Sequence, residues 1–289
     1  MPRLLLTGYF GCGNLGDDAI LLGLLQLLGN RGYEVCVASG RPEETRRLYG
    51  VSAFPRKDMN AFKTEIERSD ALVFGGGSIF QDSSSVGSAM FYSNLMRSAK
   101  KANKKVVMLG QGIGPLTSFL GKRAALSAFQ AADGIAVRDP GSVQTLKALG
   151  YTKPVALTGD LAFLLPRPTK ASEDADKFQV GNMKAVGVSI RPHGKGQSTL
   201  KLFGDFTKQL FANDYMPVML ELDESEDGPL IQELAKSQGG RIPNIRRMGS
   251  PMQLQQRMLG LRAVVGMRLH AGILSATLGV PPFMVSYDP

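Results

Sequence analysis

Short apolar runs alternate with longer amphipathic stretches along the first half of the chain. The runs expected to form strands are residues 4–7, 34–39, 71–74, 105–109, 134–137 and 154–157. Helix-like stretches separate them, for example residues 17–28, 61–68, 88–101, 120–131 and 141–149. Apolar runs without alternation, spaced by helical segments, are typical of a parallel sheet covered on both faces. The first half is therefore predicted to be Rossmann-like.

A change of composition divides this half from the rest. Residues 167–183 are rich in Pro, Lys, Asp, Glu and Ser, as expected of a linker between domains. The alternation then resumes, with strands expected at 185–190, 217–220, 263–265 and 283–285 and helices near 200–211, 230–236, 252–258 and 269–276. The sequence predicts an α/β protein of two Rossmann-like domains, residues 1–166 and 184–289, facing a cleft. Ligands of such sheets bind at the carboxyl ends of the strands, so residues just after strands are the functional candidates.

Composition supports a globular protein of the cytoplasm. The chain has 289 residues, 43% hydrophobic and 20% charged, which is enough for two cores of ordinary size. The longest apolar run, residues 19–28, is about half of what a membrane span needs. The apolar stretch at the N-terminus is too short for a signal peptide. Only Cys12 and Cys36 are present, which fits a reducing compartment.

The net charge of +9 favours anionic partners. Phosphorylated metabolites, an acidic membrane surface and nucleic acid are the three classes to consider. The lysines at 100, 101, 104 and 105 are interpreted as a solvated helix end. The chain has no Trp and no strip of interleaved aromatic and arginine residues that could stack bases, so nucleic acid is not an expected partner. Peripheral contact with an anionic membrane surface stays open.

The first strand leads into a glycine-rich turn at residues 8–18, which contains a G-x-G-x-x-G pattern at the start of a helix. A dinucleotide site is disfavoured, because the second strand ends without the ribose-binding acid and because Asp17 and Asp18 would repel a pyrophosphate. Two interpretations remain open. The turn is structural with an aspartate cap, or it forms a pocket in which Asn14 and Asp17 meet sugar hydroxyl groups.

Two further glycine clusters follow expected strands. Gly75, Gly76, Gly77 and Ser78 come after residues 71–74, and residues 110–115 come after 105–109. Glycine allows a ligand to approach the backbone closely. Ser78, Gln81 and Gln111 offer neutral hydrogen bonds that suit sugar hydroxyl groups. Plain turn formation is the competing explanation.

Arginines occupy the ends of two strands. Arg138 follows residues 134–137 and precedes Asp139 and Pro140, which are expected to cap and open the next helix. Arg138 could pair with Asp139 on the surface or grip a carboxylate or phosphate. Arg191 ends the first strand of the second domain and could likewise form a surface ion pair or bind a carboxylate or phosphate. The basic loop at residues 192–196 could also bind a phosphate.

The strand at 263–265 runs into a turn with Arg268 and His270 at the start of a helix. Free N–H groups and the helix dipole favour an anion there. His270 is one of two histidines, and histidine exchanges a proton near neutral pH. A buried capping histidine is the alternative, but the paired arginine favours catalysis. The acidic run at residues 223–227 is interpreted as solvating a loop and a helix start, and no metal site is expected.

Together these motifs resemble the polysaccharide pyruvyl transferases, in particular the bacterial cell-wall type called CsaB. The resemblance spans nearly the whole chain in the right order. The motifs that carry it are residues 13–17, 75–78, 110–112, 138–139 and 267–270.

The resemblance implies a GT-B-like architecture with the acceptor on the first domain and the donor on the second. It implies phosphoenolpyruvate as donor substrate, no cofactor, and a lipid-linked saccharide acceptor at the inner face of the cell membrane. The product would be a 4,6-ketal on N-acetylmannosamine. Residues matching Arg138, His270 and a lysine shortly after a Tyr-Asp-Pro motif act on the donor in the family. This motif is residues 287–289 here, so the donor domain is expected to be incomplete and its activity to be affected.

The chemistry of ketal formation assigns roles to these residues. His270 is expected to protonate the methylene carbon of the donor, Arg138 and Arg268 to hold its carboxylate and phosphate, and Asp17 to accept a hydroxyl proton. The other predicted substrate-binding residues are Arg191, Gly76, Gly77, Ser78, Gln111 and Asn14. Two alternatives remain: a GT-B glycosyltransferase that uses a nucleotide sugar, and a carbohydrate-binding protein without catalytic activity.

Overall fold

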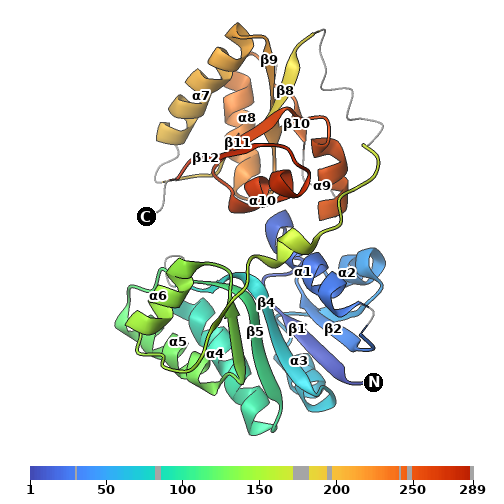
Figure 1. The fold of residues 1–289 in the computed structure, drawn as a ribbon, viewed down its shortest axis with the longest axis vertical. Helices are drawn as coiled ribbons and strands as arrows, with labels where there is room; N and C mark the ends of the chain where they lie inside the picture. Colours follow the sequence, from blue (N-terminus) through green and yellow to red (C-terminus); the bar gives the residue numbers. More distant parts are fainter. Residues whose placement is uncertain are drawn as a thin grey trace. The chain divides into compact units, whose positions relative to one another are not determined.

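The computed structural model describes residues 1–29, 31–81, 86–171, 182–193, 197–240, 242–245 and 249–286. These residues form two compact units (Figure 1). The first consists of Met1–Cys12 and Ile20–Leu164, and the second of Gly13–Ala19 and Leu165–Pro289. The short segment Gly13–Ala19, which the sequence places in the first domain, therefore groups with the second unit. Part of the expected linker, residues 172–181, lies outside the described residues.

The first unit contains a seven-stranded parallel sheet in the order β3-β2-β1-β4-β5-β6-β7. Its strands are β1 (Arg3–Thr7), β2 (Glu34–Ser39), β3 (Ser52–Pro55), β4 (Ala71–Phe80), β5 (Lys105–Ile113), β6 (Gly134–Val137) and β7 (Ala156–Leu157). Its helices are α1 (Leu15–Leu28), α2 (Pro42–Tyr49), α3 (Met59–Arg68), α4 (Val86–Lys101), α5 (Phe119–Ala131), α6 (Pro140–Ala148) and the 3-10 helix η1 (Leu161–Leu164). The strand order changes direction between β1 and β4, while all strands stay parallel, and this switch point is typical of a Rossmann fold.

The sheet is buried on both faces because its strands are apolar at almost every position. Leu5 on β1 and Phe74 on β4 belong to one core with Phe62 of α3, Tyr92 of α4 and Phe129 of α5. Side chains alternate between the faces of a strand, so the neighbours of Leu5 on β1 face the other side. There α1 contributes a second set of fully buried residues, Ile20, Leu21 and Leu24.

The second unit contains a five-stranded parallel sheet in the order β10-β9-β8-β11-β12. Its strands are β8 (Lys184–Ser189), β9 (Tyr215–Leu220), β10 (Asn244–Ile245), β11 (Ala263–Gly266) and β12 (Pro282–Met284). Its helices are α7 (Gln197–Ala212), α8 (Asp227–Ser237), α9 (Pro251–Met258) and α10 (Leu269–Thr277). Phe203 of α7 and Leu234 of α8 pack against Val188 and Met219 of the sheet. The predicted α/β class with two Rossmann-like parallel sheets is confirmed.

Four short elements of the structure were not predicted: α2, β3, β10 and the 3-10 helix η1. Helix α2 is highly charged and buries only Thr45, so it lacks the apolar stripe that identifies a helix in sequence. Strands β3 and β10 are four and two residues long and carry too few apolar positions to stand out. At β7 the expected strand of four residues is reduced to two.

Candidate functional site

The turn between β11 and α10 holds Arg268 at the N-cap position of the helix. The residue is only 8% exposed. Its Nε donates a hydrogen bond to Oδ1 of Asp227 at 3.0 Å, and its Nη2 donates to Oε2 of Glu226 at 2.7 Å. These two carboxylates neutralise the guanidinium, so Arg268 has a structural role in this turn. Direct contact between Arg268 and a donor anion stays a prediction.

Asp227, the first residue of α8, is completely buried. Its second oxygen, Oδ2, accepts hydrogen bonds from the backbone N–H groups of Leu222 and Asp223 at 3.2 and 3.0 Å. Burial raises the pKa of the Asp227 carboxyl above its ordinary value, although Arg268 opposes this rise. For Arg268, burial alone would lower the pKa, but Asp227 and Glu226 raise it. The arginine therefore keeps its charge in the interior.

The interpretation of residues 223–227 as solvating a loop and a helix start is wrong for Asp223 and Asp227, which are buried, whereas residues 224–226 are exposed. Asp223 is 8% exposed and its Oδ1 accepts hydrogen bonds from the N–H groups of Ser225 and Glu226, both at 3.1 Å, and from the Ser225 hydroxyl at 2.7 Å. Asp227 anchors Arg268 as described. Asp223 and Asp227 instead form a buried scaffold that fixes the turn between β9 and α8 and the start of α10.

The segment before α1 belongs to this scaffold. The Oδ1 atom of Asn14 accepts hydrogen bonds from the N–H groups of Gly16 at 2.8 Å and Asp17 at 3.4 Å, which satisfies the first turn of α1. Its Nδ2 donates to Oδ2 of Asp223 at 3.4 Å, and Leu15 N–H donates to the Leu222 carbonyl at 2.9 Å. Asn14 thus holds α1 to the loop after β9. A contact of Asn14 with substrate stays a prediction.

His270 lies against Gly16. A Cβ atom placed on Gly16 would come within 2.3 Å of Nδ1 of His270, so only glycine allows the imidazole to rest on the first turn of α1. His270 is half-buried and is the second residue of α10, while Arg268 occupies the N-cap. The alternative of a capping histidine is therefore not supported. Asp17, also half-buried, follows Gly16 directly, so the structure brings two of the predicted catalytic residues to neighbouring positions.

Arg191 lies just beyond the end of β8, the strand next to β11. Its side chain is 34% exposed, and its Nη2 lies 3.6 Å from Oε2 of Glu226. Glu226 therefore links Arg191 to Arg268. Of the basic loop at residues 192–196, residues 194–196 lie outside the described residues, as do residues 287–289.

The first unit has its own polar cluster, around Arg138 after β6. The Nη1 atom of Arg138 donates to Oδ2 of Asp160 at 2.9 Å, and Nη2 donates to the Ser78 hydroxyl at 2.9 Å. The guanidinium rests on the backbone of β5, where a Cβ atom on Gly112 would lie 2.6 Å from Nη2. Asp139 caps α6 by accepting a hydrogen bond from Ser142 N–H at 2.7 Å, which confirms the predicted cap. Oδ2 of Asp139 also lies 3.6 Å from Nε of Arg138, which is longer than the 2.9 Å contact between Arg138 and Asp160.

The glycine clusters prove not to be turns after short strands. Strand β4 continues through Gly76 and Gly77 to Phe80, and β5 continues to Ile113, with a shift in register between Gly77 and Phe80. Gly76 and Gly77 have φ values of 60° and 74°. Gln111 is fully buried, and its Nε2 donates to the carbonyls of Phe74 and Gly76 at 3.2 and 3.1 Å. Gln111 thus holds the irregular strand in place, while Ser78 is exposed beside Arg138.

Two functional partners were not identified in the sequence. Asp160, whose side chain is 4% exposed, orients Arg138, and Asp227 orients Arg268. Asp160 could have been found because it lies shortly after an expected strand, where cleft-edge residues occur. The sequence pattern did not distinguish Asp227 from its neighbours, because a run of acidic residues is typical of a solvated loop.

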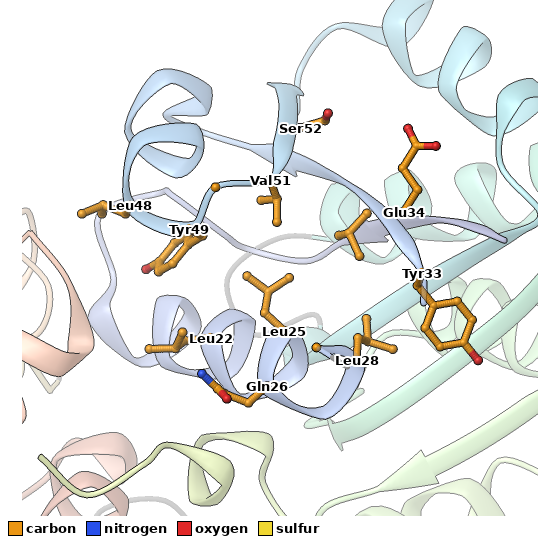
Figure 2. Close-up of a pocket in the computed structure, with 13 residues that line it drawn as sticks. Leu22, Leu25, Gln26, Leu28, Tyr33, Glu34, Leu48, Tyr49, Val51 and Ser52 are labelled. Carbon is orange, nitrogen blue, oxygen red and sulfur yellow. The ribbon is translucent and has the colours of Figure 1, made fainter. Parts of the chain in front are cut away.

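A hollow of about 530 Å³ in the first unit lies away from these residues. It is lined by the later turns of α1, the end of α2 and the starts of β2 and β3, where Leu25 of α1 points toward Val51 (Figure 2). The amino ends of parallel strands lie at the sheet edge opposite the carboxyl ends that carry Arg138. The hollow is therefore separate from the candidate site.

Within the described ranges, no group of three or more His, Cys, Asp or Glu side chains is arranged to hold a metal ion. Within the same ranges, no helix has both the length and the apolar character to cross a membrane.

The two Rossmann-like units, each a parallel sheet covered by helices, define an α/β protein of the GT-B-like fold class. Solved structures with this fold include MnaA of S. aureus, with a TM-score of 0.64 and 11% identity over 99% of this chain and 80% of that chain. Others are a UDP-GlcNAc 2-epimerase from Neisseria meningitidis (TM-score 0.60, 13% identity, 98% and 82% covered) and ADP-heptose lps heptosyltransferase II of E. coli (0.51, 15%, 98% and 83%). At such low identity the likeness shows the fold alone.

The family is narrower than the fold class. The model of the polysaccharide pyruvyl transferase family matches residues 14–289, and the chain belongs to this family. Amylovoran biosynthesis protein AmsJ of Erwinia amylovora is 22% identical over 355 residues, which cover 99% of this chain and 83% of AmsJ. The protein is therefore a transferase with a role in pyruvyl transfer during polysaccharide synthesis.

Proposed function

We propose that this protein uses phosphoenolpyruvate to build a pyruvate ketal on a sugar of a cell-wall polysaccharide precursor and releases phosphate. The sugar we favour is N-acetylmannosamine, with the ketal across O4 and O6, as in the CsaB type. Membership of the pyruvyl transferase family and similarity to a protein of amylovoran biosynthesis support this proposal. No cofactor is required by this chemistry.

The observation that carries the proposal is the seating of His270 on Gly16, next to Asp17. A titratable imidazole fixed at a helix start can serve as an acid, and a carboxylate close by in the chain can serve as a base. Ketal formation needs both kinds of group. The donor carbon must gain a proton, and the acceptor hydroxyl groups must lose theirs.

The atoms of the reaction balance without a redox step. His270 gives a proton to the methylene carbon of phosphoenolpyruvate, which leaves a cationic C2. One hydroxyl oxygen of the acceptor bonds to C2 and loses its proton to Asp17. The C2–O bond to phosphate then breaks, and the second hydroxyl oxygen bonds to C2 while its proton passes to the departing phosphate. Return of the Asp17 proton to His270 through solvent restores both side chains. The product is the acceptor plus pyruvic acid less one water, together with inorganic phosphate.

The arginines divide into two roles in this proposal. Arg268 is already bonded to Asp227 and Glu226, so it acts as a positioning residue that fixes the first turn of α10 beneath His270. Arg138 and Arg191 are each proposed to bind an anionic group of a substrate, because guanidinium groups bind carboxylate and phosphate through paired hydrogen bonds. Ser78, exposed beside Arg138, is proposed to contact the same ligand.

A lipid-linked acceptor at the inner face of the cell membrane is part of the proposal. Phe119 and Leu120, the first residues of α5, are 74% and 66% exposed, and the exposed Lys122 and Arg123 follow them. Apolar tips beside basic residues suit an anionic lipid surface. We expect F119S/L120S to reduce sedimentation with phosphatidylglycerol vesicles several-fold, whereas Leu202→Ser, at an exposed leucine of α7, should not. Equal sedimentation of both variants would argue against this contact.

The test of the proposed function is phosphate release from phosphoenolpyruvate in the presence of a lipid-mimicking disaccharide acceptor. The wild-type protein should release phosphate only with the acceptor. H270Q should lose about 100-fold or more in rate, the usual contribution of a general acid. The control D205N, on the exposed face of α7, should keep the wild-type rate.

Three results would contradict the proposal. Unchanged phosphate release by H270Q would remove His270 as the acid. A thermal shift with uridine nucleotides and none with phosphoenolpyruvate would favour a nucleotide-sugar glycosyltransferase. Glycan binding without any phosphate release would indicate a carbohydrate-binding protein.

A further inference from the structure

Arg56 stands directly after β3, at the carboxyl edge of the sheet in the first unit. Its guanidinium lies over two aromatic rings, with Cζ 5.1 Å from the centroid of Tyr9 and 5.9 Å from that of Phe91. Its Nη2 donates a hydrogen bond to the hydroxyl of Tyr92 at 2.9 Å, and that hydroxyl donates to the Gly8 carbonyl at 3.2 Å. The side chain is therefore held in one orientation by its neighbours.

Arg56 differs from the other arginines at strand ends because it has no acidic partner within the described part of the chain. Arg138 pairs with Asp160, Arg191 with Glu226, and Arg268 with Asp227. Among the residues that the structure describes, no carboxylate pairs with Arg56. Its neighbours are phenol and phenyl rings, which hold a cation by their faces and leave its charge uncompensated.

The charge of Arg56 is maintained despite partial burial. Burial alone would lower the pKa of the guanidinium, but the nearby Tyr92 hydroxyl and Cys12 thiol raise it. A guanidinium has five N–H donors, and hydrogen bonding to Tyr92 uses one nitrogen. Arg56 is thus an oriented cation with donors left for an incoming oxyanion, at the sheet edge where ligands of parallel α/β folds bind.

The exposed ring of Tyr9 adds a second recognition element. Tyr9 is 44% exposed and covers one face of Arg56. An exposed aromatic face beside an anion receptor suits a ligand that has an apolar ring surface and a negative group. A sugar phosphate has both features, since the C–H groups of a pyranose form such a surface.

We infer that Arg56 and Tyr9 bind the phosphate-bearing end of the acceptor saccharide, with the phosphate on Arg56 and the sugar ring on Tyr9. The name of the ligand rests on the proposed function, whereas the anion site itself rests on the geometry of Arg56. This assignment makes Arg56 a determinant of acceptor specificity. A saccharide without the phosphate should bind more weakly.

The experiment measures the binding of N-acetylglucosamine 1-phosphate, N-acetylglucosamine, inorganic phosphate and phosphoenolpyruvate to the full chain by calorimetry. R56Q should raise the Kd of the sugar phosphate about ten-fold or more, because a charge-assisted paired contact is lost. Binding of phosphoenolpyruvate should not change. R56K should fall between wild type and R56Q, and Y9F should bind better than Y9A. The matched control R47Q, on the exposed side of α2, should bind like wild type.

Equal Kd values for the sugar phosphate in wild type and R56Q would overturn the inference, as would equal affinity of wild type for the phosphorylated and neutral sugars. Inorganic phosphate that binds as tightly as the sugar phosphate would overturn the role of Tyr9. If R56Q unfolds, the wild-type protein still gives a test. Added KCl should weaken binding of the sugar phosphate and leave that of the neutral sugar unchanged, and equal salt sensitivity would overturn the inference.

Different results would contradict the Arg56 inference and the proposed function. If wild type forms the ketal and R56Q has the same KM for the lipid-mimicking acceptor, the Arg56 site is wrong and the function stands. If wild type forms no ketal but its sugar phosphate binding depends on Arg56, the function is wrong and the anion site stands.

Discussion

Arg268 shows at the residue scale how a strand-end arginine can be a scaffold residue. Its position before a helix is that of an anion ligand, yet its guanidinium bonds to Asp227 and Glu226. Asp227 in turn accepts hydrogen bonds from two backbone N–H groups through its other oxygen. The Asp227 carboxylate accepts four hydrogen bonds inside the protein, from Nε and Nη2 of Arg268 and from two backbone N–H groups, so it depends on Arg268 for charge compensation.

Removing one partner of this pair should be costly. We expect Arg268→Met to lower the free energy of unfolding by about 3 to 5 kcal/mol, because it leaves a buried carboxylate without a counter-charge. D227N should cost a similar amount. The double variant R268M/D227N should lower the free energy of unfolding by less than the sum of the two single changes, because neither side chain is left as an unpaired buried charge. Urea unfolding measures all four proteins, and additive effects would show that the two side chains do not interact.

At the element scale, the first turn of α1 packs against the first turn of α10. Asn14 caps the first turn of α1, Gly16 leaves space for the imidazole, and His270 fills it. The sequence pattern indicates a glycine-rich turn before a helix, but no local rule says that its third glycine serves a histidine more than 250 residues away. That role follows only from the folded structure.

The space at Gly16 yields a prediction about catalysis. G16A should displace the His270 ring, since the new methyl group would lie 2.3 Å from Nδ1. We expect kcat for phosphate release to fall about ten-fold or more, as misplaced catalytic groups lose rate steeply, with little change in the melting temperature. The control G204A, on α7 in the same unit, places its methyl group 3.7 Å from Leu234 and should leave kcat unchanged. A wild-type kcat for G16A would show that the imidazole does not need this position.

Across the whole molecule, the elements were more predictable than the pairings between them. The strand and helix pattern, the parallel sheets and the Asp139 cap follow from local apolar runs and capping chemistry. The continuation of β4 through three glycines does not, because Gln111 on the next strand supports it by hydrogen bonds to two carbonyls. The ion pairs join residues distant in sequence, such as Arg138 with Asp160 and Arg268 with Asp227. Such pairings arise from tertiary packing, which a single sequence does not encode locally.

The central claim is that this transferase protonates phosphoenolpyruvate at carbon and captures the resulting cation with two acceptor hydroxyl groups. The most direct measurement is mass spectrometry of the acceptor after reaction in D2O. The account predicts a gain of pyruvic acid less one water, at least one deuterium in the ketal methyl group, and one phosphate released per ketal. H270Q should form this product at least about 100-fold more slowly. An acceptor that gains a sugar, or a ketal methyl group without deuterium, would contradict the account.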